Sequence, residues 1–140
     1  SDGQLSARVQ PTFAAPFDAG VLFVHQSTTD YAKLCFERSP SGEDTIVSVV
    51  TRNTSDDANG PVIAGGSVEL RISTFRSVVA FHWSTDGSHW HLARYFRLRD
   101  PDTPIALGLA AQSPTGSGCS VSFTEIRWTD AVPDDIRNGT

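Results

Sequence analysis

Apolar and polar residues alternate one by one along almost the whole chain, in short runs separated by Gly, Pro, Asp and Ser. A period of two places every second side chain on one face of an extended strand, and no stretch follows the ~3.6-residue period of a helix. The pattern predicts nine strands, over Gln4–Gln10, Ala19–Gln26, Tyr31–Arg38, Thr45–Arg52, Ser67–Ser73, Val78–Ser84, Trp90–Leu98, Ile105–Gln112 and Cys119–Trp128. Short strands at intervals of ~8–12 residues are typical of β-sandwiches and barrels, so the chain is predicted to be all-β.

Turn-forming residues separate the predicted strands. Ser39–Gly42 and Thr85–Ser88 combine Pro, Asp, Ser and Gly in the manner of tight hairpin connections. Asn53–Gly60 and Asp100–Pro104 are longer polar connections, and Ser113–Gly118 is a Gly-containing loop before the last strand. Because loops of this kind commonly carry function, these segments are candidates for binding residues.

Three predicted strands are apolar at nearly every position: Val21–Val24, Ile46–Val50 and Ile105–Leu109. Strands covered on both sides have this composition, as do strands that lie beneath a shallow groove. We therefore expect one sheet to have a recessed outer face. Residues 129–140 are polar and aperiodic, so they are predicted to form a C-terminal tail after a single domain of residues 1–128.

Composition and charge exclude several classes of partner. The chain has 140 residues and a net charge of −5, with Lys and Arg scattered singly, whereas nucleic-acid binding needs a clustered basic face. No run approaches the ~18–20 apolar residues of a membrane span. Cys35 and Cys119 lie in alternating apolar segments without a zinc-spaced companion, so we expect buried free thiols rather than a disulfide. Free thiols favour the reducing cytoplasm, with secretion as the alternative.

Several separated segments occur in the order found in one family of proteins: Tyr31–Glu37, Val47–Thr51 followed by Ser55–Asn59, Phe81–Gly87 followed by Trp90, Arg94–Phe96 and Gln112–Cys119. They resemble the domain of unknown function 1349 family, also labelled "regulation of enolase protein 1", within the concanavalin A-like lectin/glucanase superfamily. The resemblance covers nearly the whole chain and implies a jelly-roll sandwich of two antiparallel sheets, one of them concave. It implies no catalytic residues, because the family has no established activity.

The chain departs from the family pattern in two ways. Family members usually carry additional strands before the segment that Gln4–Val9 resembles, and the absence of Met also indicates a processed or truncated piece. The resemblance therefore implies either a compact variant closed by its own loops or a sandwich with one open edge. Relatives often have Cys at the position of Ala58, and its absence removes a partner for Cys35 or Cys119.

Carboxylate pairs are the first chemistry to consider on this fold. Jelly-roll glycoside hydrolases use two acids ~5–10 Å apart, commonly two Glu on one strand. Here Glu37 is alone on its strand, Glu69 shares a wet face with Arg71, and Glu125 lies near the end of the last strand. An acid pair assembled from different strands stays open, but no catalytic residue is predicted.

A polar stripe on one predicted strand is the main candidate for binding. Alternation places Tyr31, Lys33, Cys35 and Glu37 on one face, which is either the floor of a ligand groove or an ordinary solvated surface. Arg94 interrupts an apolar face formed by its neighbours, so its charge needs a ligand or a carboxylate, for example Glu37. The predicted ligand-binding residues are Lys33, Glu37, Ser48, Arg52, Arg94 and Gln112, with Asp56, Asp57 and Asn59 on a loop at the rim.

Metal binding is predicted to be absent, with one alternative. The Ser55–Gly60 loop offers the oxygen ligands that calcium prefers, but it lacks the regular spacing and distal Glu of a calcium loop. Calcium is therefore the alternative to a hydrogen-bonding loop. His89 and His91 share a face of one strand, but no third ligand of known placement accompanies them.

The sequence favours a non-catalytic module that binds an oligosaccharide or another small polar ligand. Trp83 and Trp90 are expected in the core, which leaves Tyr95 as the exposed ring able to stack on a sugar. Two alternatives remain. One is a protein-interaction domain that receives a partner strand, or a second copy, at an open sheet edge. The other is a glycoside hydrolase-like enzyme.

Overall fold

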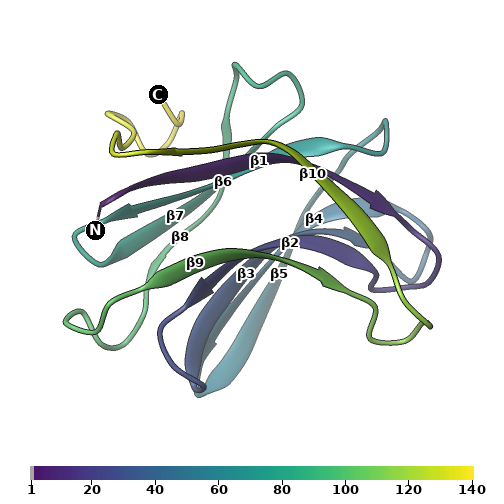
Figure 1. Cartoon of the computed structure of the whole chain (residues 1–140), viewed down its shortest axis with the longest axis horizontal. Coiled ribbons are helices and arrows are strands. Elements are labelled where there is room, and N and C mark those ends of the chain that lie inside the picture. Colours follow the sequence, from purple (N-terminus) through teal and green to yellow (C-terminus); the bar gives the residue numbers. More distant parts are fainter. Residues whose placement is uncertain (1) are drawn as a thin grey trace.

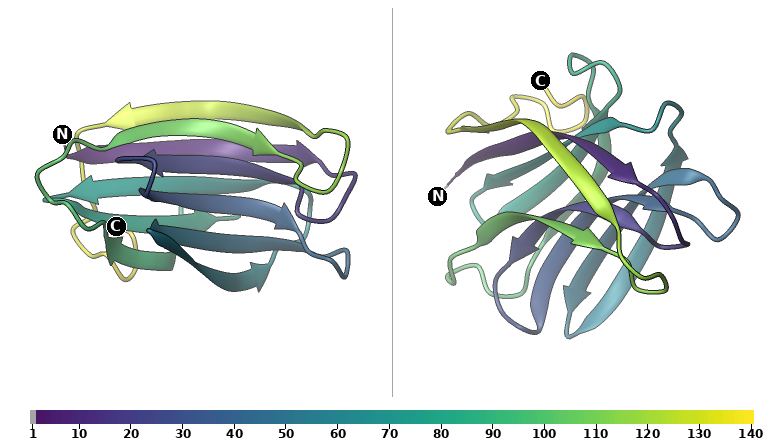
Figure 2. Two further views of the ribbon diagram at one scale, coloured as in Figure 1. Left: turned by 90° about the horizontal axis from the view of Figure 1, so that it is seen from below. Right: turned by 45° about the vertical axis from the view of Figure 1, so that its right-hand side comes forward.

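Two five-stranded antiparallel sheets pack face to face in the computed structural model, which describes residues 2–140 (Figure 1). The strands are β1 (Gly3–Thr12), β2 (Ala19–His25), β3 (Asp30–Arg38), β4 (Asp44–Arg52), β5 (Thr54–Val62), β6 (Val68–Phe75), β7 (Val78–Ser84), β8 (His91–Arg97), β9 (Ala106–Gln112) and β10 (Ser120–Thr129). Sheet A has the order β10-β1-β6-β7-β8, and sheet B has the order β5-β4-β3-β2-β9. The strands of both sheets run roughly along one axis, as in an aligned sandwich (Figure 2).

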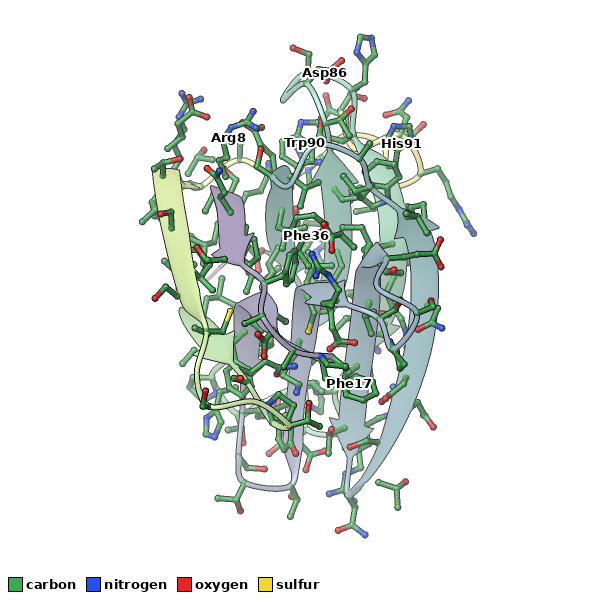
Figure 3. All side chains as sticks on the ribbon, turned by 90° about the vertical axis from the view of Figure 1, so that its right-hand side faces the viewer. Arg8, Phe17, Phe36, Asp86, Trp90 and His91 are labelled. Carbon is green, nitrogen blue, oxygen red and sulfur yellow. The ribbon has the colours of Figure 1, made fainter. Side chains whose placement is uncertain are left out.

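The hydrophobic core fills the space between the sheets. Its largest fully buried apolar side chains include Leu70, Ile72 and Phe81 from sheet A and Leu22, Leu34, Phe36 and Ile46 from sheet B. Phe81 meets Phe96 edge to face, with ring centroids 4.9 Å apart, and Phe36 meets Phe13 in the same way at 5.4 Å. Figure 3 places Phe36 in the middle of the molecule. Each fully buried side chain of this size stabilises the fold by about 1.5–3 kcal/mol.

The structure confirms the all-β jelly-roll prediction and contains all nine predicted strands. It adds a tenth, β5, where the sequence predicted a polar loop. All nine residues of β5 are exposed, so no burial pattern marks the strand. The backbone is extended there because it pairs antiparallel with β4 from Arg52 opposite Thr54 to Thr45 opposite Val62.

A β-bulge changes the predicted faces of β8. The register with β7 shifts between Phe81 and His82, so that Arg94 lies opposite Phe81 but Leu92 lies opposite His82. A bulge adds one residue to one strand and moves the following side chains to the other face. Arg94 and Phe96 therefore face the core side of sheet A, whereas Leu92 lies opposite His82 on the other side. The expectation that Trp90 lies in the core is wrong: its ring lies against the guanidinium of Arg71, 4.2 Å from ring centroid to Cζ.

The C-terminal segment, predicted as a tail, folds back over the outer face of sheet A (Figure 1). The side chain of Arg71 on β6 donates a hydrogen bond to the carbonyl oxygen of Gly139, 2.5 Å away. His82 on β7 lies 2.7 Å from the carbonyl oxygen of Ile136, measured from its Nε2. Burial lowers the pKa of Arg71 to about 10, which is the consequence of covering a guanidinium with chain. No helix long and apolar enough to cross a membrane occurs in residues 2–140.

Candidate functional site

The outer face of sheet B carries a groove with a floor of small apolar side chains. Residues directly opposite one another on paired strands share a face. Ala19, Val21, Cys35 and Val47 are all buried here, although they point away from the core between the sheets, and Phe23 and Val49 pack beside them. The sequence predicted this recessed face from the unbroken apolar runs of β2 and β4.

A chain of polar side chains crosses this floor from β9 to β3. Lys33 Nζ donates a hydrogen bond to Gln112 Oε1 at 3.1 Å. The amide nitrogen of Gln112 in turn donates to Glu37 Oε1 at 3.2 Å and to the carbonyl oxygen of Phe17 at 3.3 Å. Gln112 lies opposite Ala19, which lies opposite Glu37, so the strand register itself brings these groups together. The three side chains hold one another in a fixed polar array.

Two adjoining hollows open above this array. The first has a volume of about 390 Å³ and is lined by Phe17, Lys33, Glu37, Val47, Val49, Ser55, Asp57, Asn59, Gln112 and Pro114. The second has a volume of about 590 Å³ and shares four of these residues, Phe17, Glu37, Val47 and Asn59. We call the two hollows together the sheet B groove. Each hollow falls within the ~300–1,000 Å³ typical of small-molecule sites.

One wall of the sheet B groove is strand β5 and the other is the loop after β1. Asp57 and Asn59 lie opposite Val49 and Val47 on β4, so their side chains share the outer face. Phe17 belongs to the loop and is 39% exposed, which leaves its ring open to solvent. Figure 3 places Phe17 well away from Arg8, Asp86, Trp90 and His91, which gather toward the other end of the view.

The electrostatics of the groove are set by two carboxylates and one ammonium group. Burial raises the pKa of Glu37, Lys33 opposes that shift, and the negative charge of Asp57 adds to it. Burial, together with the charge of Glu37, raises the pKa of Cys35 to about 12, so this thiol stays protonated beneath the groove. The Cys35 thiol of the floor is therefore held in its less reactive protonated form, and the charged groups of the polar array lie above it.

Three aromatic rings lie side by side on the same face, beyond Lys33. The ring of Phe23 is stacked between His25 at 6.0 Å and Tyr31 at 5.8 Å between centroids. The sequence placed Tyr31 on the face of Lys33 without predicting it as a ligand-binding residue, and it assigned neither Phe17 nor Phe23 to the site. The two-residue register of the β2–β3 hairpin, in which Phe23 pairs with Lys33, is the signal that would have found Phe23. Nothing in the sequence marks Phe17.

Five of the nine predicted ligand-binding residues therefore meet in the sheet B groove: Lys33, Glu37, Asp57, Asn59 and Gln112. The other four are Ser48, Arg52, Asp56 and Arg94, which we call the edge cluster. They lie where β4 and β5 of sheet B face β8 of sheet A, on the face of sheet B that is turned away from the groove. They do not form one groove with the first five, because alternate residues of a strand point to opposite faces.

The edge cluster joins the two sheets. Arg94 on β8 donates to Ser48 Oγ on β4 and to the carbonyl oxygen of Asp56 on β5, both at 3.4 Å. Arg52 donates to the carbonyl oxygen of Arg97 at 2.9 Å and lies 3.7 Å from the carboxylate of Asp56. The predicted pairing of Arg94 with Glu37 is wrong, since Glu37 lies on the other face of sheet B.

The predicted rim loop is strand β5, and its geometry bears on the calcium alternative. Asp56 lies opposite Val50 and Asp57 opposite Val49, so their carboxylates leave the strand on different faces. The carboxylates of Asp56 and Asp57 therefore cannot both bind the same calcium ion. Among residues 2–140, no group of three or more His, Cys, Asp and Glu side chains is placed to hold a metal ion.

The remaining candidate side chains have structural partners. His89 pairs with Asp86 at 2.7 Å in the β7–β8 turn, and His91 stacks on Trp83 with centroids 4.2 Å apart. Tyr95 is 52% exposed but lies on sheet A, away from the groove. Cys35 and Cys119 are both free, as expected, although Cys119 is only partly buried.

Comparison with known proteins agrees with this fold. The family model described as "Protein of unknown function (DUF1349)" matches residues 1–131. A functionally unknown protein from Saccharomyces cerevisiae has a similar structure, with a TM-score of 0.81 and 26% identity over 92% of this chain and 69% of that chain. No curated protein matches the chain.

Two further structural neighbours have lower identity, which shows the fold alone. The GH43 BlXynB protein from Bacillus licheniformis has a TM-score of 0.81 and 18% identity over 93% of this chain and 28% of that chain. CG-16, a homodimeric agglutinin from chicken liver, has a TM-score of 0.51 and 14% identity over 92% of this chain and 95% of that chain. The neighbours are concanavalin A-like jelly rolls, whereas nothing in the matches supports the label "regulation of enolase protein 1". The chain belongs to the DUF1349 family of β-sandwich domains.

Proposed function

We propose that the sheet B groove binds an oligosaccharide and that the domain acts as a non-catalytic recognition module. The observation that carries the proposal is the fixed array of Lys33, Gln112 and Glu37 above a closed apolar floor. A ligand that displaces water from such a floor meets polar groups already held in place, so little ordering entropy is lost on binding.

The chemistry of the groove matches a sugar better than an apolar ligand. Amide, carboxylate and ammonium groups offer both donors and acceptors, as a row of hydroxyl groups requires. The exposed ring of Phe17 offers an apolar surface for the face of a pyranose at the rim. Two connected hollows of about 390 and 590 Å³ provide room for more than one sugar unit.

Two structural neighbours support the ligand class by analogy. One is a GH43 protein, and GH43 is a glycoside hydrolase group; the other is named an agglutinin. This chain spans only 28% of the GH43 neighbour, so the activity of the whole neighbour is not transferred.

A matched pair of variants on β5 tests the proposal. An array of plant, bacterial and animal oligosaccharides identifies the best ligand, and titration calorimetry measures its Kd. Asp57→Asn removes a charge from the groove and is expected to weaken binding at least about tenfold. Asp56→Asn removes the same charge from the other face, so its Kd should stay within about twofold. Asp56 is 65% exposed in its side chain, and the loss of such a surface ion pair costs little stability.

Two outcomes contradict the proposal. One is the absence of binding across the array by a protein that is folded by circular dichroism. The other is an equal effect of Asp56→Asn and Asp57→Asn, which would place the ligand elsewhere.

A hydrolytic function is the second candidate, because Glu37 and Asp57 line the same hollow and the pKa of Glu37 is raised by burial. Two carboxyl groups that face one hollow can divide the roles of general acid and general base in hydrolysis. Product analysis of the bound oligosaccharide by mass spectrometry separates the two functions. Turnover that Glu37→Gln abolishes supports hydrolysis, whereas binding without turnover supports the recognition module.

A further inference from the structure

Strand β9 differs from the other three strands at the ends of the sheets. Proteins protect such strands with charges, prolines or bulges, since an unpaired backbone edge recruits other strands. β5 carries Asp56, Asp57 and Pro61, and β10 carries Glu125 and Arg127 beside a bulge. β8 carries Arg94 and Arg97 and has a bulge in its pairing with β7. β9 carries none of these devices.

The free edge of β9 is apolar as well as unprotected. It pairs with β2 on one side, and it has no strand on the other side within residues 2–140. Its sequence is Ala-Leu-Gly-Leu-Ala-Ala-Gln, and four of the seven residues are exposed. Leu109 is 37% exposed although it lies opposite Leu22, a residue with no exposure. A partner strand at this edge would cover backbone and leucine side chain together.

Five residues of β9 form a palindromic sequence, so they can pair with a second copy of themselves. Residues Ala106–Ala110 read the same in both directions, with Gly108 at the centre. Two antiparallel copies in register about Gly108 therefore pair Leu107 with the partner's Leu109 and Ala106 with the partner's Ala110. An isologous contact about a two-fold axis requires such self-complementarity. No charge on β9 opposes a second copy.

The faces of β9 fit this pairing. Leu107 and Leu109 lie opposite Val24 and Leu22, so they point to the core side. Four leucines, two from each copy, would then meet across the axis and extend the core. Gly108 lies opposite Phe23 on the groove side, where the small side chains of β9 let the outer face continue without obstruction.

From this geometry we propose that the chain forms a two-fold dimer through antiparallel β9–β9 pairing, which joins the two copies of sheet B into one ten-stranded sheet. The two sheet B grooves then lie on the same face of one continuous sheet. The partner is a second copy of this chain, and the pairing does not depend on what the groove binds.

The first test is the oligomeric state in solution. Analytical ultracentrifugation over a wide concentration range is expected to give a mass twice the 15.1 kDa of the chain, dissociating on dilution. Leu109→Lys places a charge at the pairing edge and should raise the dimer Kd at least about tenfold. Val62→Lys is the matched control, because Val62 is a 54% exposed apolar residue on β5, at the other end of sheet B.

The second test gives a positive signal even if a lysine variant folds poorly. Gly108→Cys, in a Cys119→Ser background, should form an intermolecular disulfide, because directly paired antiparallel residues have Cα atoms ~4.5–5.5 Å apart. A Cβ at Gly108 meets no atom within 4 Å, so the variant is accommodated. Ala110→Cys is the control: its copies lie four residues out of register, ~14 Å apart, and should not cross-link.

Three results would overturn the dimer. They are a monomer mass at every concentration, equal weakening by Leu109→Lys and Val62→Lys, and equal rates of cross-linking for Gly108→Cys and Ala110→Cys.

Discussion

Cys35 lies beneath the sheet B groove, and its reactivity reports whether the groove floor is closed to water. The residue has no exposed surface, and burial with the neighbouring charge of Glu37 raises its pKa from an ordinary value of 9.0 to about 12. Iodoacetamide reacts with the thiolate, so a raised pKa slows alkylation. The experiment adds iodoacetamide at pH 8 to the folded protein and, separately, to the protein unfolded in urea.

The expected effect follows from the two pKa values. At pH 8 a thiol with the ordinary pKa is roughly 10% thiolate, whereas one with a pKa of about 12 is roughly 0.01% thiolate. Alkylation of Cys35 should therefore be about 1000-fold slower in the folded protein than in urea. Burial also limits the access of the reagent to Cys35, which slows alkylation in the same direction.

Intact-mass spectrometry with peptide mapping measures both cysteines in one time course. Cys119 is partly exposed and serves as the internal control that should react first in the folded protein. If Cys35 in the folded protein reacts within about tenfold of its rate in urea, the floor is open to water and the reasoning about the groove is wrong.

Two further predictions concern the sandwich itself. Phe81→Ala should cost about 3–5 kcal/mol, because it removes a fully buried ring and its edge-to-face contact with Phe96. With about 2.1 cal/mol/K of unfolding entropy per residue, a chain of 140 residues loses about 3.4 °C in Tm per kcal/mol, so calorimetry should show a fall of about 10–17 °C. Phe75→Ala, at a 39% exposed ring, is the control, and an equal fall there would contradict the packing argument. The second prediction concerns the two hydrogen bonds of 2.7 Å from Arg99, which hold the pKa of Asp30 well below its usual range. Since this carboxyl group has a lowered pKa in the folded state, the stability it contributes is fully present above pH ~4 and is lost as the pH falls through the folded pKa. The difference in Tm between the natural protein and Arg99→Met should therefore shrink between pH 5 and pH 2, and a constant difference would exclude this linkage.

The strands could be predicted from the sequence wherever one face is buried and the other is wet. β6 is an example, since Val68, Leu70 and Ile72 alternate with polar residues and all three are buried. β5 could not be predicted, because both of its faces are exposed, its residues do not alternate between apolar and polar, and only its pairing with β4 makes it a strand. The alternation of apolar and polar residues indicates which face of a strand is buried. An exposed edge strand lacks that pattern, because its extended conformation depends on the strand with which it pairs.

The candidate site could be predicted in part, for the same reason. Lys33 and Glu37 share a face by simple alternation within one strand, and the sequence was sufficient to place them together. Arg94 was misplaced because alternation within β8 does not show which face of the other sheet lies opposite: Arg94 pairs with Phe81 on the core side, where it meets Ser48 and Asp56 rather than the groove. Phe17 was missed because it belongs to a loop, in a left-handed backbone conformation with a φ of 68° that no hydrophobic pattern encodes.

Strand β5 serves two regions at once, since Asp57 lines the groove and Asp56 belongs to the edge cluster. Which side chain of β5 faces which region depends on the tight turn at Asn53. Asn53 has a φ of 68°, which Asn tolerates well, and its backbone nitrogen donates a hydrogen bond to the carbonyl oxygen of Thr29 at 2.7 Å. A slip of one residue in the pairing with β4 would exchange the two sets of side chains. The length of this turn therefore decides which side chains of β5 line the sheet B groove: a single-codon insertion or deletion there would exchange the groove's β5 wall for the other face of that strand, while every amino acid of β5 stayed the same.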